Sequence, residues 1–293
     1  MLASIVIRTY NEARYLPEVL LAVCKQTVVP WEREIILVDS GSKDRTLEIA
    51  KHHGCRIVHI KQSDFSFGRS LNVGCEVARG RNLVFISGHC VPTSPDWLAR
   101  LVAPIEAGEA GITYGRQEGG PETKFSEHML FAKYFPEADL PPPSEFFCNN
   151  ANAAVRKDLW ERHRFDETLT GLEDMHFARR VVAEGGKVRY VPGSSVYHYH
   201  HETWRKVKIR YEREAIALQK IMPEVHVHAS DALRYFVAGV FGDWARALGQ
   251  KRFLRFASEI ICFRFCQFYG TWRGNHIHRQ LSRKSKEKYF YPR

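Results

Sequence analysis

Residues 84–96 read VFISGHCVPTSPD. The stretch begins inside an apolar run, residues 83–86, that predicts a buried β-strand. The run ends at Ser87, Gly88 and His89, and two prolines further along prevent the strand from continuing. In an open parallel sheet, ligands bind at the carboxyl ends of the strands. His89 is therefore a candidate active-site residue, and a turn residue bonded to its neighbours is the alternative.

Strand and helix patterns alternate on both sides of this stretch. Apolar runs at 4–8, 34–38, 56–60 and 83–86 are each followed by helical spacing, at 13–26, 45–53, 67–79 and 96–105. Residues 110–115 and 187–191 are further predicted strands, 157–164 and 172–184 are predicted helices, and 117–145 is a predicted long loop. The alternation predicts an α/β fold, with a mostly parallel sheet and helices on both faces.

The character of the chain changes near residue 203. Residues 204–221 predict a basic helix, and residues 231–269 predict two more helical stretches in which aromatic residues and arginines alternate. Residues 1–200 contain 24 Lys and Arg against 25 Asp and Glu, whereas residues 201–293 contain 19 against 8. We therefore expect one domain over 1–203 and a basic, aromatic-rich helical region over 204–293.

Three interpretations of the basic region stay open. Interleaved arginines and aromatic residues are typical of helices that lie on an anionic membrane surface. The same helices can instead pack on the first domain or form a homodimer interface. Nucleic-acid binding is not expected, because no recognisable module for it is present.

The composition is that of a globular protein, with 293 residues of which 44% are hydrophobic and 26% charged. No apolar run reaches the roughly 18 residues that suggest a transmembrane helix, and the N-terminus lacks the pattern of a signal peptide. The seven cysteines include no CxxC pair, which is typical of reduced thiols. We expect a cytoplasmic protein, peripheral at the inner face of the membrane if the basic region docks there.

Several segments, in this order, resemble family 2 glycosyltransferases with the GT-A fold. They are VIRTYNE (6–12), ILVDSGSKDRTLEIA (36–50), GRSLNVGCEVARGRNLVFISGH (68–89) and FDETLTGLEDMHFARRVVAEGGKVRYVPGSSVYHYH (165–200). The resemblance implies an inverting hexosyl- or deoxyhexosyltransferase that moves a sugar from a nucleotide-sugar donor to an acceptor hydroxyl. It also implies a saccharide or lipid-linked acceptor in the assembly of an envelope polysaccharide or glycoconjugate.

The resemblance implies roles for individual residues. Asp174 matches the usual catalytic base, and Glu173 is the alternative base or an acceptor contact. The positions that match nucleotide and donor contacts are Thr9, Asn11, Glu12, Asp39, Ser40, Asn72, Ser87, Gly88 and Asn152. Arg69 is added because it is expected on the same helix as Asn72, as a cation near the diphosphate.

The metal motif departs from the family. The usual Asp-x-Asp falls on Ser87-Gly88-His89. Serine cannot replace a carboxylate as a metal ligand, while histidine binds Mn²⁺ or Zn²⁺ well and Mg²⁺ poorly. The resemblance implies a divalent cation, Mn²⁺ or Mg²⁺, and we expect His89 to hold it with His198 and His200, which would share one face of a strand.

Two alternatives to this metal site stay open. In the first, catalysis needs no metal and His89 contacts the diphosphate directly. In the second, the chain is a non-catalytic carbohydrate- or nucleotide-binding protein that has lost the metal motif.

Overall fold

The computed structural model describes residues 2–27, 32–139, 144–276 and 288–290. The chain forms two compact units. The first contains Met1–Gly120, Phe131–Thr168 and Glu173–Tyr199, and the second contains Pro121–Leu130, Leu169–Leu172 and His200–Arg293.

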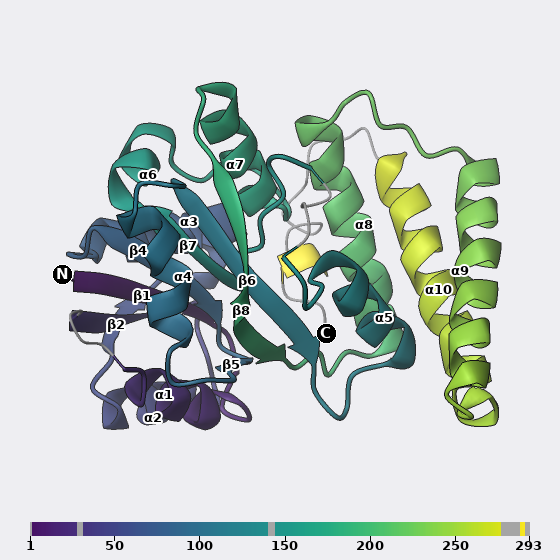
Figure 1. Cartoon of the computed structure of the whole chain (residues 1–293), viewed down its shortest axis with the longest axis horizontal. Coiled ribbons are helices and arrows are strands. Elements are labelled where there is room, and N and C mark those ends of the chain that lie inside the picture. Colours follow the sequence, from purple (N-terminus) through teal and green to yellow (C-terminus); the bar gives the residue numbers. More distant parts are fainter. Residues whose placement is uncertain (1, 28–31, 140–143, 277–287, 291–293) are drawn as a thin grey trace. The chain divides into compact units, whose positions relative to one another are not determined.

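The first unit is built on an eight-stranded sheet (Figure 1). The strands are β1 (Leu2–Thr9), β2 (Glu32–Asp39), β3 (Arg56–His59), β4 (Asn82–Ser87), β5 (Cys90–Pro92), β6 (Ile112–Gly119), β7 (Asn152–Arg156) and β8 (Val188–His198). Their spatial order is β3-β2-β1-β4-β7-β6-β8-β5. Neighbours among β1 to β4 run parallel, whereas β7 runs antiparallel to both β4 and β6. The predicted mostly parallel α/β sheet is confirmed.

Helices cover both faces of this sheet. One face carries α1 (Leu16–Cys24), α2 (Thr46–His52) and α4 (Trp97–Glu106), and the other carries α3 (Phe67–Val77), α6 (Lys157–His163) and α7 (Glu173–Ala183). A short 3₁₀ helix, η1 (Gln62–Asp64), precedes α3. The side chains of β1 alternate between the two cores, since Ile5 and Ile7 pack on the α1 side and Val6 on the α3 side. Burial on both faces explains the unbroken apolar runs of the central strands.

Strand register brings the carboxyl ends of β1, β2 and β4 to one edge of the sheet. Thr9 pairs with Asp39, and Arg8 pairs with Ser87. Immediately after Ser87 and Gly88 comes His89, and the short β5 then pairs antiparallel with the end of β8, Cys90 opposite His198. Polar residues that are far apart in the sequence therefore meet at this edge.

The predicted loop over 117–145 was wrong for much of its length. Strand β6 continues to Gly119, and Phe125–Tyr134 form the helix α5; residues 140–143 lie outside the described part. The polar end of β6 remains in the sheet because it pairs with β8, which runs on to His198 instead of ending at the predicted residue 191. Charged and glycine residues in this segment resembled a loop, but tertiary pairing overrides such local preferences.

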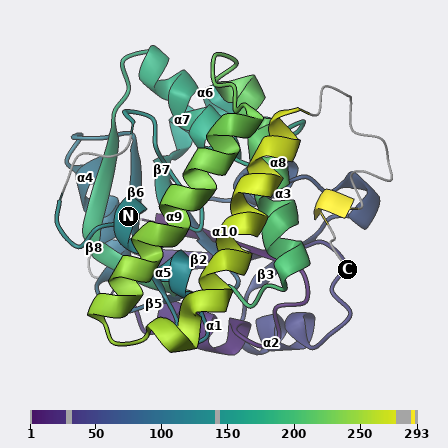
Figure 2. The ribbon, with the colours of Figure 1, turned by 90° about the vertical axis from the view of Figure 1, so that its right-hand side faces the viewer.

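The second unit is mainly helical and confirms the predicted helices after residue 203. It contains α8 (Trp204–Ile221), α9 (Ala229–Gly249) and α10 (Phe253–Asn275), and α10 packs against both α8 and α9. Figure 2 shows α9 and α10 running side by side. The first part of α5 belongs to this unit, where Phe125 packs with Val240 and Ile260. Among the described helices, none has the length and apolar character required to cross a membrane.

Candidate active site

The loops that follow β1 and β2 are fastened to each other. The Asp39 carboxylate is buried and accepts hydrogen bonds from the backbone N–H groups of Gly41 (2.9 Å) and Ser42 (3.0 Å). Asn11, in the left-handed region at φ 57°, donates its backbone N–H to the Ser42 hydroxyl (2.9 Å) and accepts the Lys43 N–H on Oδ1 (2.8 Å). Ser40 Oγ donates to the carbonyl of Thr9 (3.2 Å). The structure thus brings Thr9, Asn11, Asp39 and Ser40 together, as a rigid pair of loops.

The helix α7 begins with two carboxylates in different surroundings. Glu173 Oε1 accepts a charge-assisted hydrogen bond from Arg8 Nη1 (2.9 Å). Asp174 accepts only backbone N–H groups among its recorded partners, those of Asn150 (2.9 Å) and Met175 (2.8 Å). Burial, together with the adjacent Glu173, raises the pKa of Asp174 to about 7. At neutral pH this carboxyl is therefore close to its titration midpoint, as suits a group that accepts a proton.

Two predicted metal ligands face each other in the first unit. The rings of His89 and His198 are stacked, with their centroids 5.1 Å apart. Nδ1 of His89 lies 2.9 Å from Glu12 Oε1, and Nδ1 of His198 lies 2.7 Å from Gln117 Oε1. An acceptor oxygen at Nδ1 favours the tautomer with its proton there, so that Nε2 carries the lone pair.

Gly88 gives Glu12 the space to reach His89. A Cβ atom at this position would lie 2.9 Å from Glu12 Cγ and 3.3 Å from the carbonyl oxygen of Arg8. Glycine is therefore required here for close packing. Neither Glu12 nor Gln117 was predicted to orient a histidine, because their strands and loops approach the histidines only in the folded chain.

His200, the third predicted metal ligand, lies in the second unit. Its Nδ1 is 2.7 Å from Glu127 Oε1, and Arg210 Nη2 contacts both Glu127 (2.5 Å) and Glu202 (2.9 Å). Burial alone would raise the pKa of Glu127, but Arg210 and His200 outweigh it and hold that pKa well below its usual range. Glu127 was missed as a partner of His200 because the segment that contains it was predicted to be a loop.

Three residues predicted to contact the donor have other partners. The Asn72 amide holds the Phe165 backbone and the Trp160 indole, and its remaining N–H bonds Glu167. Asn152 accepts from the Trp97 indole and donates to two backbone carbonyls. Arg69 is half-exposed and pairs with Glu167 at 3.1 Å. The two amides are fully engaged in joining segments of the fold.

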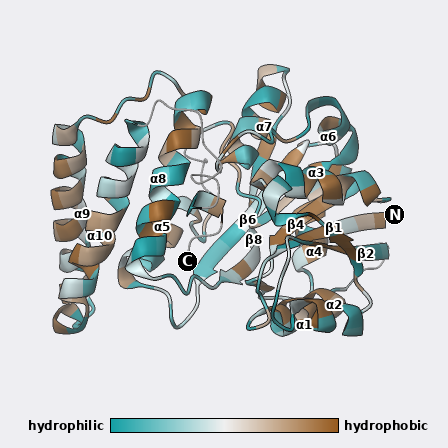
Figure 3. Ribbon diagram, turned by 180° about the vertical axis from the view of Figure 1, so that it is seen from behind, coloured by the Kyte–Doolittle hydropathy of each residue, from teal (hydrophilic) through white to brown (hydrophobic). Residues whose placement is uncertain are grey.

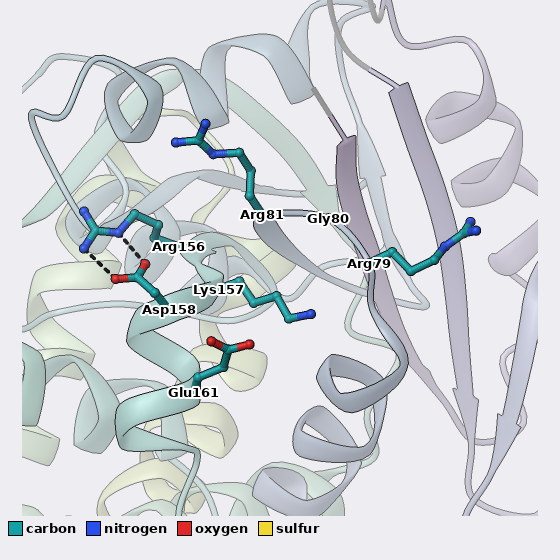
Figure 4. A pocket seen from close by; sticks show the side chains of 7 residues that line it. All are labelled: Arg79, Gly80, Arg81, Arg156, Lys157, Asp158 and Glu161. Atoms are coloured by element: carbon teal, nitrogen blue, oxygen red, sulfur yellow. Dashed lines mark hydrogen bonds and ion pairs between the residues drawn. The ribbon is translucent and has the colours of Figure 1, made fainter.

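A basic hollow of about 520 Å³ lies at the other edge of the sheet, where β4 begins (Figure 4). Its cations already have partners: Arg79 pairs with Glu34 (2.9 Å), Arg81 with Glu106 (3.5 Å), Arg156 with Asp158, and Lys157 donates to the carbonyl of Ala78 (2.7 Å). The hollow lies at the amino ends of the parallel strands, away from Asp39. We therefore assign it no part in donor binding.

Comparison with known proteins decides the family. Residues 4–164 match the family described as Glycosyl transferase family 2, over more than half of the chain. The chain belongs to this family. It is accordingly a glycosyltransferase, and its relatives include enzymes of polysaccharide assembly.

Two relatives, from a bacterium and an archaeon, show how similar this glycosyltransferase is to known proteins. It is 27% identical over 223 residues to the O-antigen chain rhamnosyltransferase RfbN of Salmonella typhimurium, covering 72% of this chain and 70% of the relative. It is 32% identical over 192 residues to the glycosyltransferase AglE of Haloferax volcanii, covering 62% of each protein.

Solved structures confirm the GT-A fold of the glycosyltransferase. The mannosyltransferase PcManGT of Pyrobaculum calidifontis, in complex with GDP-Man and Mn²⁺, is similar with a TM-score of 0.61 at 15% identity, over 99% of this chain and 87% of that one. TarS of S. aureus, in complex with UDP-GlcNAc, is similar with a TM-score of 0.55 at 17% identity, over 95% and 93%.

Proposed function

We propose that this glycosyltransferase moves a deoxyhexose or hexose from a nucleoside-diphosphate donor to a hydroxyl of a saccharide or lipid-linked saccharide, with inversion. The polysaccharide-assembly relatives support an envelope polysaccharide or glycoconjugate as the product. The observation that carries the proposal is the buried Asp174 carboxylate, with its pKa raised to about 7, at the carboxyl edge of the sheet.

Asp174 is the proposed general base. It takes the proton from the attacking acceptor hydroxyl as the oxygen forms its bond to the anomeric carbon and the donor diphosphate leaves with its electron pair. The Glu173 carboxylate is instead engaged in an ion pair with Arg8. Its proposed role is to position Arg8 and to keep the pKa of Asp174 high through its negative charge.

The fastened loops after β1 and β2 are the proposed nucleotide-binding surface. Thr9, Asn11, Asp39 and Ser40 lie together there, and their hydrogen bonds to one another hold the backbone in a fixed shape. Such pre-organisation lowers the entropic cost of binding a ligand. Ser87, the last residue of β4, and Gly88, which follows it, complete this surface in the proposal.

The histidines at and near the position of the usual Asp-x-Asp motif fit a divalent cation. His89 and His198 each have an acceptor at Nδ1, which is the arrangement that usually supports a metal-bound imidazole. We propose these two as ligands, both within the first unit. When bound, the cation neutralises charge that develops on the leaving diphosphate. Imidazole donors favour Mn²⁺ or Zn²⁺ over Mg²⁺.

A donor-turnover screen tests the proposal. Nucleotide sugars, including nucleotide-activated rhamnose, mannose and N-acetylglucosamine, are incubated with the full-length protein, with Mn²⁺, Mg²⁺ or chelator. We expect one donor to release nucleoside diphosphate. Asp174→Asn should lose this activity, and Asp158→Asn should retain it. Asp158 is a matched control because it also lies in the first turn of a helix. Donor binding without turnover under all conditions would instead favour a non-catalytic protein.

A further inference from the structure

The last two helices of the second unit present large apolar side chains to solvent. On α9, Leu233, Val237, Phe241 and Leu248 are 42–63% exposed, and their spacing places them in one stripe along the helix. A second stripe on α10 contains Leu254, Ile261, Phe265 and Tyr269. Figure 3 shows hydrophobic segments along α9. The members of both stripes are exposed, although Phe265 also contacts Phe236 of α9 and Tyr269 contacts Lys208 of α8.

The two stripes meet on one face of the hairpin. Leu233 and Phe236 of α9 and Phe265, Tyr269 and Trp272 of α10 line a single groove of about 290 Å³. Of the twelve large hydrophobic side chains exposed in the described part of the chain, nine lie on α9 and α10. An apolar patch concentrated in this way marks an interaction surface.

The charge around this face is positive. Residues 229–275 contain seven Lys and Arg against three Asp and Glu. The three carboxylates serve internal contacts: Asp243 pairs with the buried Arg264 (2.8 Å), Glu259 accepts the Phe125 N–H (2.7 Å), and Asp231 accepts the His228 N–H (3.1 Å). The basic residues at the turn between the helices are exposed instead. The turn at one end of this face therefore has complementary charge for an anionic partner.

The turn between α9 and α10 combines both properties at one place. Lys251, Arg252 and Arg255 are exposed there, and Leu254 among them is 94% exposed. Leu248, at the end of α9, is 59% exposed. Apolar side chains surrounded by arginine and lysine are what a helix needs to lie at the boundary between lipid headgroups and acyl chains.

We propose that the α9–α10 hairpin docks on an anionic phospholipid bilayer. Its two apolar stripes enter the headgroup boundary, and Lys251, Arg252 and Arg255 contact lipid phosphates. The exposed cations at the turn favour an anionic bilayer, and a second copy of this chain is the competing occupant that the experiments below distinguish. This inference goes beyond the proposed function and depends on neither its donor nor its base.

Vesicle flotation of the full-length protein tests the docking. We expect binding to phosphatidylcholine vesicles in which a quarter of the lipid is phosphatidylglycerol, little binding to phosphatidylcholine alone, and release by high salt. Leu248→Glu with Leu254→Glu should weaken binding at least about tenfold, because two apolar side chains no longer enter the bilayer. Leu21→Glu is the matched control, since Leu21 is an exposed leucine (47%) on α1 of the first unit.

Several outcomes would overturn the proposal. They are no binding to anionic vesicles, equal binding to neutral vesicles, or unchanged binding by the double variant. A dimer in analytical ultracentrifugation that the double variant dissociates, without vesicle binding by the unmodified protein, would assign the face to a second copy. Unchanged far-UV circular dichroism and thermal unfolding of the variants show that they fold.

A labelling experiment provides a second measurement without substitutions. Cys262 on α10 is the exposed cysteine among the seven. An environment-sensitive fluorophore on this thiol should shift to shorter wavelength when anionic vesicles are added, and should not shift with neutral ones. No shift with anionic vesicles would contradict docking through this hairpin.

Discussion

Arg8 Nη1 lies 2.9 Å from Glu173 Oε1, and this ion pair makes the two adjacent carboxylates of α7 chemically different. Glu173 is paired with a cation, while Asp174 is buried and accepts hydrogen bonds from the backbone N–H groups of Asn150 and Met175. Two neighbouring acids whose surroundings separate them in this way can take separate roles in one reaction.

The rate of sugar transfer should depend on the ionisation of Asp174. Since the base must be deprotonated, kcat/KM should rise with pH through about 7, the raised pKa of Asp174, and level off above it. Asp174→Asn should lower kcat by about 10²–10⁴-fold. Steady-state kinetics at constant ionic strength measure both effects. A profile that is flat between pH 5 and 9 would remove Asp174 from the proton transfer.

Substitution of Glu173 by glutamine should move the acidic limb of this profile. The negative charge of Glu173 raises the pKa of Asp174, and Arg8 lowers it. Glu173→Gln removes the negative charge that raises the pKa of Asp174, while the lowering effect of Arg8 remains. The acidic limb should therefore shift to lower pH, with most activity retained. If activity is instead lost as in Asp174→Asn, Glu173 is the base.

The pKa of Asp174 also predicts a cost in stability. Because folding raises this carboxyl pKa from 3.8 to about 7, the folded state binds the proton more tightly, and stability falls as pH rises between these values. At pH 8 the ionised group should cost on the order of 4 kcal/mol. The difference in unfolding free energy between the unmodified protein and Asp174→Asn, measured at pH 5 and pH 8, should change in favour of the variant at the higher pH. An equal difference at both values would contradict the raised pKa.

The acceptors at the histidine Nδ1 atoms should control metal affinity. Glu12→Gln and Gln117→Leu should each weaken Mn²⁺ binding by about 10–100-fold, since the oxygen that accepts the Nδ1 proton fixes the tautomer and orientation of an imidazole ligand. Isothermal titration calorimetry or the EPR signal of Mn²⁺ measures this without turnover. Glu48→Gln, at an exposed surface pair with Arg45, is the control for Glu12→Gln. Unchanged affinity in both variants would place the metal elsewhere or make the enzyme metal-independent.

Two glycines should govern the packing of α10 on α8. A Cβ atom at Gly274 would lie 2.1 Å from the carbonyl oxygen of Glu212, and one at Gly270 would lie 2.5 Å from that of Lys208. Gly274→Ala should therefore destabilise the protein by about 1–3 kcal/mol, through displacement of the helices. Gly242→Ala on α9, where a Cβ meets nothing within 4 Å, should instead stabilise by up to about 1 kcal/mol. Denaturant unfolding of the two variants measures the change in unfolding free energy for each. If Gly274→Ala leaves this free energy unchanged, the helices can move apart at little cost.

The parts of the fold that depend on local pattern could be predicted from the sequence. Strands β1, β2 and β4 are buried on both faces, so their apolar runs are unambiguous, and Asp39 and Ser87 follow from where those runs end. Helix α5 was missed because its apolar side chains pack with two different units and leave no simple periodic face. Contacts such as Glu12 with His89 join residues 77 positions apart, and no local pattern records them.

The surroundings of the three predicted histidine ligands could be predicted only in part. The family resemblance implied that His89 stands where a carboxylate is usual, and strand alternation indicated a shared face for His198 and His200. The assignment of the last two histidines to different compact units depends on where β8 ends, at His198, and such boundaries are set by tertiary pairing. The amides of Asn72 and Asn152 show the opposite difficulty, because a family position gave no indication that their hydrogen bonds are used within the fold.

The composite origin of the helical unit restricts how this enzyme can be recombined with its relatives. Phe125 packs with Val240 and Ile260, and the Thr170 hydroxyl donates to the carbonyl of Arg213 (2.7 Å). A chimera that exchanges residues 204–293 alone would leave the segments Pro121–Leu130 and Leu169–Leu172 to pack against helices from another protein. An exchange that carries Pro121–Leu130 and Leu169–Leu172 along with the C-terminal helices keeps their contacts, so the transferable part of the protein is three pieces of chain instead of one.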